Sequence, residues 1–290
     1  MEARVLTGTI LALTAAVAFA LTNAAASLAF SGGSNPSTLA AFRFVLPALV
    51  LMAWLAAERR PPRLPKRDAW IAVSLGALTA VYSWALLSAI GSIPLALAIL
   101  IFYLFPLVAT VILAVLGWES LGWKTVAAIV VAFAGLVLAL DPRVGRINLE
   151  GVLSGLVAAT GLGIVVAVSS RVFRSGDSRP VTLYLSTVAA VLLIGFCAQQ
   201  GDVALPNTAS GWTGFVAAML FYAFAVIAFF IAVSMIGPAR TSLLSYAEPV
   251  VSAGLGVAVL GEVLTLAQVG GIVLMVGALA AATMLKQPAR

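Results

Sequence analysis

Apolar stretches of about twenty residues follow one another along the whole chain, and no other feature limits its fold as strongly. A helix that crosses the hydrocarbon core of a bilayer needs about 20 mostly apolar residues. Ten stretches of this kind occur, and short polar or Gly/Pro-rich connections separate them. The sequence therefore predicts an all-α polytopic membrane protein with ten transmembrane helices, at residues 6–29, 36–57, 69–90, 93–116, 122–140, 149–172, 180–199, 210–236, 239–260 and 264–285.

The composition excludes several other classes of protein. Hydrophobic residues make up 63% of the chain and charged residues 9%, so the helices cannot form a water-soluble surface. The chain has no His, and its one Cys, Cys197, lies within an apolar stretch. A disulfide framework and a His/Cys metal site are therefore excluded, and we expect no metal and no cofactor. Most hydrolytic chemistry is excluded as well, so we expect that the protein is not an enzyme.

Lys and Arg are distributed asymmetrically between the two sides of the predicted helices. If the N-terminus is cytoplasmic, thirteen of the 16 Lys and Arg lie in cytoplasmic segments. On the opposite side lie Arg143 and Arg146, and Arg43 lies within a helix. Because Lys and Arg collect in cytoplasmic loops, both termini are predicted to be cytoplasmic. The same placement explains the net charge of +6 without a nucleic-acid partner.

The sequence matches itself at an offset of 143 to 144 residues, close to half its length. The clearest block aligns residues 103–106 (YLFP) with residues 246–249 (YAEP). We therefore predict two five-helix repeats, 1–145 and 146–290, integrated in one membrane domain. Because five is odd, the second repeat starts from the opposite side of the membrane and the two repeats are inverted. Inverted repeats are typical of secondary transporters, whose substrate site lies near the membrane midplane.

Several motifs accompany this repeat. They are Arg43-Phe44 in the second predicted helix, Pro94 and Pro106 in the fourth, residues 245–250 (SYAEPV), and Gly261-Glu262 followed by Thr265, Gln268 and Gly270-Gly271. With these motifs, the whole chain resembles the ten-helix EamA-type members of the drug/metabolite transporter superfamily. The resemblance implies export or exchange of small metabolites, often amino acids, without ATP. Within that family, the chain is similar to aromatic amino acid exporters of the YddG kind.

Two charged residues lie deep within predicted helices. Arg43 lies about 10 Å and Glu248 about 14 Å from the start of its helix, at about 1.5 Å per residue. Burying either charge costs several kcal/mol unless the charge is paired or hydrated. We hypothesise that Glu248 binds a substrate ammonium group or a proton, and that Arg43 neutralises Glu248 or binds a carboxylate. The structural alternatives are a buried ion pair, or an Arg43 side chain that reaches the outer membrane surface.

Other polar and aromatic residues are predicted to line the same cavity. Thr241, Ser245, Glu248 and Ser252 form one polar stripe on the ninth predicted helix, and lipid cannot solvate such a stripe. Aromatic rings with a few polar groups would suit a large apolar or aromatic solute, although core packing and lipid contact are the alternatives for these rings. The predicted cavity residues are Asn23, Arg43, Thr79, Tyr82, Ser83, Phe102, Tyr103, Tyr222, Ser245, Tyr246 and Glu248.

Prolines and acids also occupy matching positions in the two repeats. The matched prolines are Pro94, Pro106, Pro238 and Pro249. Because proline removes a backbone hydrogen bond and kinks a helix, we predict that these four are hinges that open two gates in turn. Fixed curvature around a cavity is the alternative. Glu119 and Glu262 fall in matching turns, where we expect them to cap helix ends.

These features together predict a secondary transporter of small organic metabolites that works by alternating access around a central cavity. Amino acids, including aromatic ones, are the expected substrates of an exporter or exchanger. The alternatives are a passive channel and a membrane-embedded lipid-modifying enzyme, which would need clustered acids. We expect a multi-pass protein of a bacterial-type inner membrane, with a small-molecule substrate and the lipid bilayer as partners. The sequence leaves the oligomeric state open, and a monomer is compatible with this fold.

Overall fold

The computed structural model describes residues 2–60, 62–117, 123–140, 148–172, 178–201, 203–236, 241 and 244–285. Its elements are α1 (Glu2–Ser31), α2 (Pro36–Arg43), α3 (Val45–Ala57), α4 (Lys66–Ser92), α5 (Leu95–Phe102), α6 (Phe105–Val115), α7 (Trp123–Leu140), α8 (Leu149–Val172), α9 (Ser178–Gln200), α10 (Ala209–Ile236), α12 (Ala247–Leu260) and α13 (Leu266–Leu285). These described ranges contain no strand. Seven spans, counting α2 with α3 and α5 with α6, are long and apolar enough to cross a membrane. The all-α polytopic fold class is confirmed.

Three of the predicted spans are interrupted. At Pro106 and Pro249, where kinks were predicted, one helix ends and another begins, and a further break precedes Pro47, where no kink was predicted. The second span breaks at Phe44 between α2 and α3, the fourth at 103–104 between α5 and α6, and the ninth at Tyr246 just before α12. Each break precedes a proline by two or three residues. Proline lacks an N–H group and its ring clashes with the preceding turn, so a helix ends before it and a new helix starts.

The prolines concerned are Pro47, Pro106 and Pro249, the third, second and third residues of α3, α6 and α12. Pro106 and Pro249 are related by the 143-residue offset, so the two repeats break at equivalent points. Both breaks therefore lie midway along a membrane span, where backbone groups left without helical partners must find other ones.

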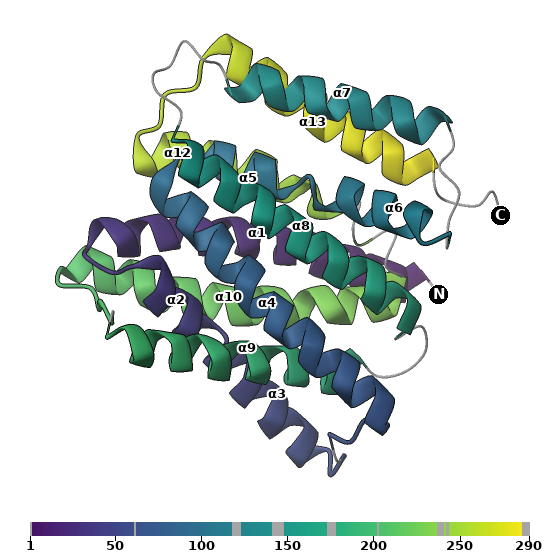
Figure 1. Cartoon of the computed structure of the whole chain (residues 1–290), viewed down its shortest axis with the longest axis vertical. Helices are drawn as coiled ribbons and strands as arrows, with labels where there is room; N and C mark the ends of the chain where they lie inside the picture. The colour runs from purple at the N-terminus through teal and green to yellow at the C-terminus, as the bar shows by residue number, and fades with distance from the viewer. Residues whose placement is uncertain are drawn as a thin grey trace.

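The two repeats interlock in space (Figure 1). The first helix of each repeat packs along the third helix of the other: α1 lies against α10, and α8 lies against α4. The fifth helices, α7 and α13, pack side by side. The beginning of α1 and the end of α13 lie on the same side of the molecule in this view. This exchange of equivalent contacts is the arrangement expected of inverted repeats.

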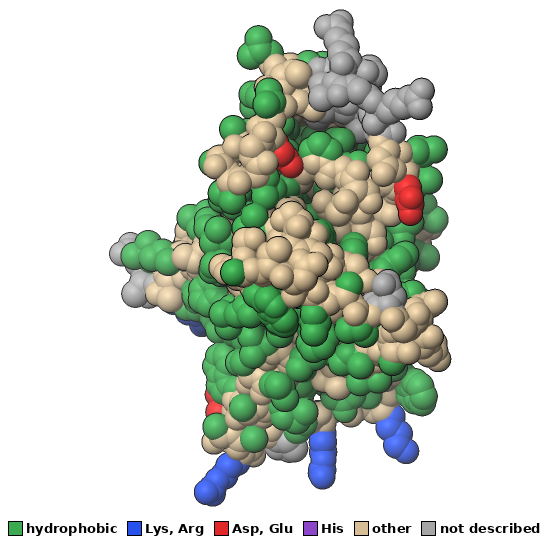
Figure 2. Space-filling view, turned by 90° about the vertical axis from the view of Figure 1, so that its left-hand side faces the viewer, with side chains coloured by type: hydrophobic (Ala, Val, Ile, Leu, Met, Phe, Trp, Pro, Cys, Tyr) green, Lys and Arg blue, Asp and Glu red, His purple; other side chains and the backbone are tan. Residues whose placement is uncertain are grey.

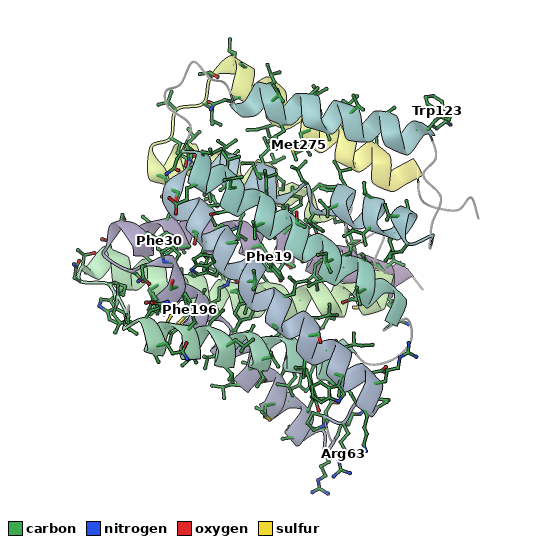
Figure 3. The ribbon with its side chains drawn as sticks, viewed as in Figure 1. Phe19, Phe30, Arg63, Trp123, Phe196 and Met275 are labelled. Atoms are coloured by element: carbon green, nitrogen blue, oxygen red, sulfur yellow. The ribbon has the colours of Figure 1, made fainter. Side chains whose placement is uncertain are left out.

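Apolar side chains cover the outside of the bundle, as lipid contact requires. Leu6, Val137 and Val273 are all mostly exposed. In Figure 2, which shows the end where α5 and α13 begin, the Lys and Arg side chains in view project mainly from the lower edge. Figure 3 labels Arg63 and Trp123 towards the opposite end, in segments that the charge distribution assigns to the cytoplasmic side.

Glycine and alanine allow the long helices α1 and α10 to approach closely. A Cβ atom at Gly214 of α10 would lie 2.6 Å from the Ala25 carbonyl oxygen and 2.7 Å from the Ala29 amide nitrogen, both on the backbone of α1. Backbone atoms cannot move aside as a side chain can. The α1–α10 contact therefore needs glycine at this position.

Replacing Gly214 by Ala is expected to lower the stability of the protein by about 1–3 kcal/mol, because the added methyl group forces the two helices apart. Thermal unfolding in detergent, followed by fluorescence or by loss of monodispersity, measures this change. Gly195→Ala is the matched control, since a Cβ at Gly195 meets nothing within 4 Å. Equal midpoints for the two variants would contradict this account of the packing.

Candidate substrate site

Glu248 lies at the centre of a polar site that joins both repeats. Its carboxylate is buried, with 5% of the residue exposed, in the first turn of α12. The Asn23 side-chain amide of α1 donates to Oε1 at 3.0 Å, and the Tyr103 hydroxyl, at the end of α5, lies 2.8 Å from Oε2. A carboxylate in a membrane interior needs such partners or a counter-charge. Three helices thus converge on one acid.

Tyr103 also contacts the break in the ninth span. Its hydroxyl lies 2.7 Å from the Ser245 carbonyl oxygen. In an unbroken helix, this carbonyl would accept from the amide four residues later, but that residue is Pro249, which has no N–H group. A side-chain hydroxyl from the other repeat therefore lies within hydrogen-bond distance of the carbonyl that Pro249 leaves without its helical donor.

Arg43, the last residue of α2, lies in a second buried part of the site. Its guanidinium donates to Ser83 Oγ of α4 and stacks over the Tyr222 ring at 4.5 Å. Such a contact between a cation and an aromatic ring is favourable, more so when water is excluded. Arg43 is 2% exposed, and its Nε has no hydrogen-bond partner. The site therefore holds a donor that a ligand could use.

Arg43 neither reaches the outside of the bundle nor contacts Glu248. A side chain with 2% exposure does not reach the membrane surface. Within the ranges that the structure describes, no ion pair within 4.0 Å joins Arg43 to Glu248; the pairs there are Arg60–Glu58 and Arg179–Glu58. Two opposite charges are thus buried in one site without direct contact.

Aromatic rings connect the two polar groups. Tyr82 stacks on Phe102 at 6.5 Å, Phe102 contacts Tyr103 at 6.1 Å, and Tyr103 contacts Tyr246 at 5.9 Å. On the other side, Tyr222 contacts Phe44 at 5.2 Å and Phe19 at 6.1 Å. The rings have geometries typical of aromatic pairs, and together they are the aromatic wall of the site.

The structure brings the predicted cavity residues together. All are buried except Tyr82, which is half-buried. Ser245 and Tyr246 lie at the break before α12, and Thr79 lies one turn before Ser83 on α4. Two contributing rings, Phe19 and Phe44, are absent from the predicted set. Phe19 could have been found, since it precedes Asn23 by one helical turn and shares its face.

The polar stripe of the ninth span is buried as expected, although the helix is broken within it. Thr241, Ser245 and Ser252 are buried together with Glu248. Ser252, one turn after Glu248, has a hydroxyl without a hydrogen-bond partner. Both Ser252 and Glu248 therefore face protein and not lipid, and Ser252 adds a second polar group available to a ligand.

Three of the four predicted hinge prolines lie at the ends of helices. Pro94 is the N-cap of α5, and Pro106 and Pro249 lie in the first turns of α6 and α12. Pro238 is outside the described residues. These positions suit bending, and the hinge motion itself stays a prediction.

Glu262 caps a helix of the other repeat. Gly261, with φ of +71° in the left-handed region that glycine adopts readily, ends α12 and turns the chain towards α5. Glu262 Oε1 accepts from the Leu95 amide at 2.5 Å and Oε2 from the Ala96 amide at 3.5 Å, at the N-terminus of α5. A carboxylate at a helix N-terminus is stabilising, so the expected capping role of Glu262 is confirmed. Its counterpart Glu119 is outside the described residues.

Replacing Glu262 by Ala is expected to lower stability by about 1–2 kcal/mol, because two amides of α5 lose their acceptor. The thermal unfolding midpoint measures the loss, and Glu262→Gln should recover part of it, since an amide oxygen still accepts. Glu150→Ala, an exposed acid in the first turn of α8, is the control and should change the midpoint less. A midpoint unchanged by Glu262→Ala would show that the cap contributes nothing.

The opposite end of the bundle has its own contact between repeats. Glu58 follows the last residue of α3. Arg179 of α9 donates to its carboxylate at 2.8 Å, and Trp54 donates to the same carboxylate at 2.7 Å. These bonds hold the pKa of Glu58 below its ordinary value.

A surface cavity of about 320 Å³ lies close by and is lined by Met52, Leu55, Ala56, Arg59, Arg60 and Pro62. It is separate from the buried site around Glu248.

Two inverted repeats that enclose buried charges and aromatic rings are typical of secondary transporters. The sequence profile of the EamA-like transporter family matches residues 6–140 and again residues 149–284. The chain therefore belongs to the EamA-like transporter family. It is also similar to a solved structure described as "Crystal structure of protein", with 26% identity, a TM-score of 0.67 and 96% of each chain covered. No curated protein matches.

Proposed function

We propose that this chain exports or exchanges amino acids, including aromatic ones, by alternating access around the Glu248–Arg43 site. The observation that carries the proposal is the presence of two opposite buried charges that do not pair with each other. An amino acid carries an ammonium group and a carboxylate on one carbon atom. Glu248 is suited to the ammonium group, and Arg43, with its unpartnered Nε, is suited to the carboxylate.

The aromatic wall supports a substrate with a large side chain. Tyr82, Phe102 and Tyr103 on one side and Phe44 and Tyr222 on the other surround the charged groups. Rings of this kind bind an aromatic side chain by edge-to-face and offset contacts. In this conformation the site residues are buried, so a substrate would enter only after one end of the bundle opens.

The charge distribution supports the orientation of the protein in the membrane. Lys and Arg concentrate at one end, so we infer that both termini are cytoplasmic in a bacterial-type inner membrane. In that orientation Glu262 lies at the outer end of the bundle and Glu58 at the cytoplasmic end.

Counterflow in proteoliposomes tests this function. Vesicles loaded with unlabelled phenylalanine should take up labelled phenylalanine transiently above equilibrium, with saturation. Phenethylamine, which lacks the carboxylate, and phenylpropionate, which lacks the ammonium group, should compete far less well. Uptake that rises linearly with concentration would contradict a carrier and favour a channel, and equal competition by all three compounds would contradict recognition of both charges.

A further inference from the structure

We propose that the Tyr103 hydroxyl couples the protonation of Glu248 to the helix break at Pro249. The inference rests on the proposed role of Glu248 as the carboxylate of the transport site. Tyr103 is assigned here as a positioning residue: it links the acid to the backbone of the ninth span, and its hydroxyl is near two acceptors at once. The Ser245 carbonyl oxygen lies 2.7 Å and Glu248 Oε2 lies 2.8 Å from it.

A phenol hydroxyl has one proton and therefore donates one strong hydrogen bond at a time. When Glu248 is ionised, both neighbours are acceptors and they compete for that proton. The charged carboxylate attracts it more strongly than a neutral carbonyl does. Tyr103 then donates to Glu248, and the Ser245 carbonyl loses the donor that replaces the missing Pro249 amide.

When Glu248 is protonated on Oε2, all of these groups are satisfied. The Glu248 O–H donates to the Tyr103 oxygen, and the Tyr103 O–H donates to the Ser245 carbonyl. One proton is added to the carboxylate, and no other covalent bond is made or broken. The hydroxyl rotates about its C–O bond, and the break before α12 gains a hydrogen bond. Protonation thus stiffens the ninth span, whereas ionisation loosens it.

Among the groups around the Glu248 carboxyl group, the Tyr103 hydroxyl is the one that connects it to the Ser245 carbonyl at the helix break. From α1 the acid faces the uncharged amide of Asn23. From α2 it faces Arg43, which acts at a distance without an ion pair, and from α5 it faces Tyr103. Tyr246, at the start of α12, lies against the Tyr103 ring. Among these groups, Tyr103 is the one that contacts both the acid and the broken helix.

Amide hydrogen exchange of the purified protein in nanodiscs tests the coupling without any substrate. Rates for α12 peptides would be measured from about pH 4 to about pH 9, the range in which exposed and buried carboxyl groups titrate, and corrected with an α1 peptide as reference. In the wild type, we expect exchange in the first turns of α12 to be about 3- to 10-fold slower at low pH, the effect of one neutral hydrogen bond.

Tyr103→Phe and Glu248→Gln should each abolish this pH dependence. Tyr184→Phe removes a hydroxyl from a half-buried tyrosine of α9 and should behave as the wild type. Pro249→Ala restores an amide to the Ser245 carbonyl, so it should keep α12 protected from exchange at every pH. This variant tests the coupling even if Tyr103→Phe does not fold. A pH response that survives in Tyr103→Phe or Pro249→Ala, or that is absent from the wild type, overturns the coupling. Failure of amino acid counterflow would instead overturn the proposed function, because hydrogen exchange needs no substrate.

Discussion

Glu248→Gln is expected to reduce phenylalanine counterflow by about 10- to 100-fold, the largest loss that we predict from a single substitution. Glutamine keeps the size of the side chain and can still accept from Asn23, but it removes the negative charge. A hydrogen bond to a charged group contributes about 1.5–3 kcal/mol, and about 1.4 kcal/mol corresponds to a factor of ten in rate. The loss should therefore follow from substrate recognition and not from misfolding.

Initial counterflow rates at subsaturating phenylalanine measure the effect of Glu248→Gln. The variant should also respond less to pH, because the titrating carboxyl group is gone. Glu150→Gln, which neutralises an exposed acid on α8, is the matched control. Elution as a monodisperse peak and an unchanged unfolding midpoint would show that the fold is kept. If flux and its pH dependence were both unaffected, Glu248 would have no part in transport.

Arg43→Gln is expected to change which compounds the protein recognises. Without the guanidinium, the carboxylate of an amino acid loses its partner, so phenylalanine should compete about tenfold or more less well. Phenethylamine has no carboxylate and should compete as well as it does in the wild type. Arg43→Lys should recover little, because an ammonium group lacks the planar fork that can bond Ser83 and a ligand together.

Competition curves for both compounds, measured with the wild type and Arg43→Gln, give this comparison. Arg63→Gln removes an exposed cation near the start of α4 and is the control for net charge. Parallel losses for phenylalanine and phenethylamine would indicate that Arg43 supports the structure of the site and does not bind the carboxylate.

Hydropathy predicts the spans of this protein because a bilayer leaves few alternatives. A long apolar run such as 6–29 must form a helix when no water is present to bond its backbone, and α1 covers it. Kinks were predicted at Pro106 and Pro249, but the separation of each span into two helices was not, because a proline near the centre of a run is compatible with a kink, a hinge or two separate helices. At the break before Pro249, the Tyr103 hydroxyl lies near the Ser245 carbonyl and Glu248. Tyr103 is 145 residues away from Glu248 in the sequence, so the local sequence does not predict this contact.

The residues of the site were predictable for the same reason as the spans. A polar residue in an apolar run, such as Asn23 or Arg43, must face protein or water, so it marks the side of its helix that faces the interior of the protein. The sequence does not show which residue it will bond. Asn23 meets Glu248 across 225 positions, and Arg43 meets Ser83 and not Glu248. Such pairings follow from how the two repeats interlock, which no local pattern encodes.

The exchange of equivalent contacts between the repeats has a consequence for how the protein is made. Ala12, Ala16 and Ala20 of α1 are buried, and one face of α1 packs along α10, which is synthesised more than a hundred residues later. During synthesis α1 enters the bilayer long before α10 exists, so this face must first be in contact with lipid. Small apolar side chains are compatible with this interval of lipid exposure, because they suit lipid contact as well as close helix packing. The first repeat is therefore inserted into the membrane before it can pack against the second. Until the second repeat is inserted, the helices of the first must be stable in contact with lipid.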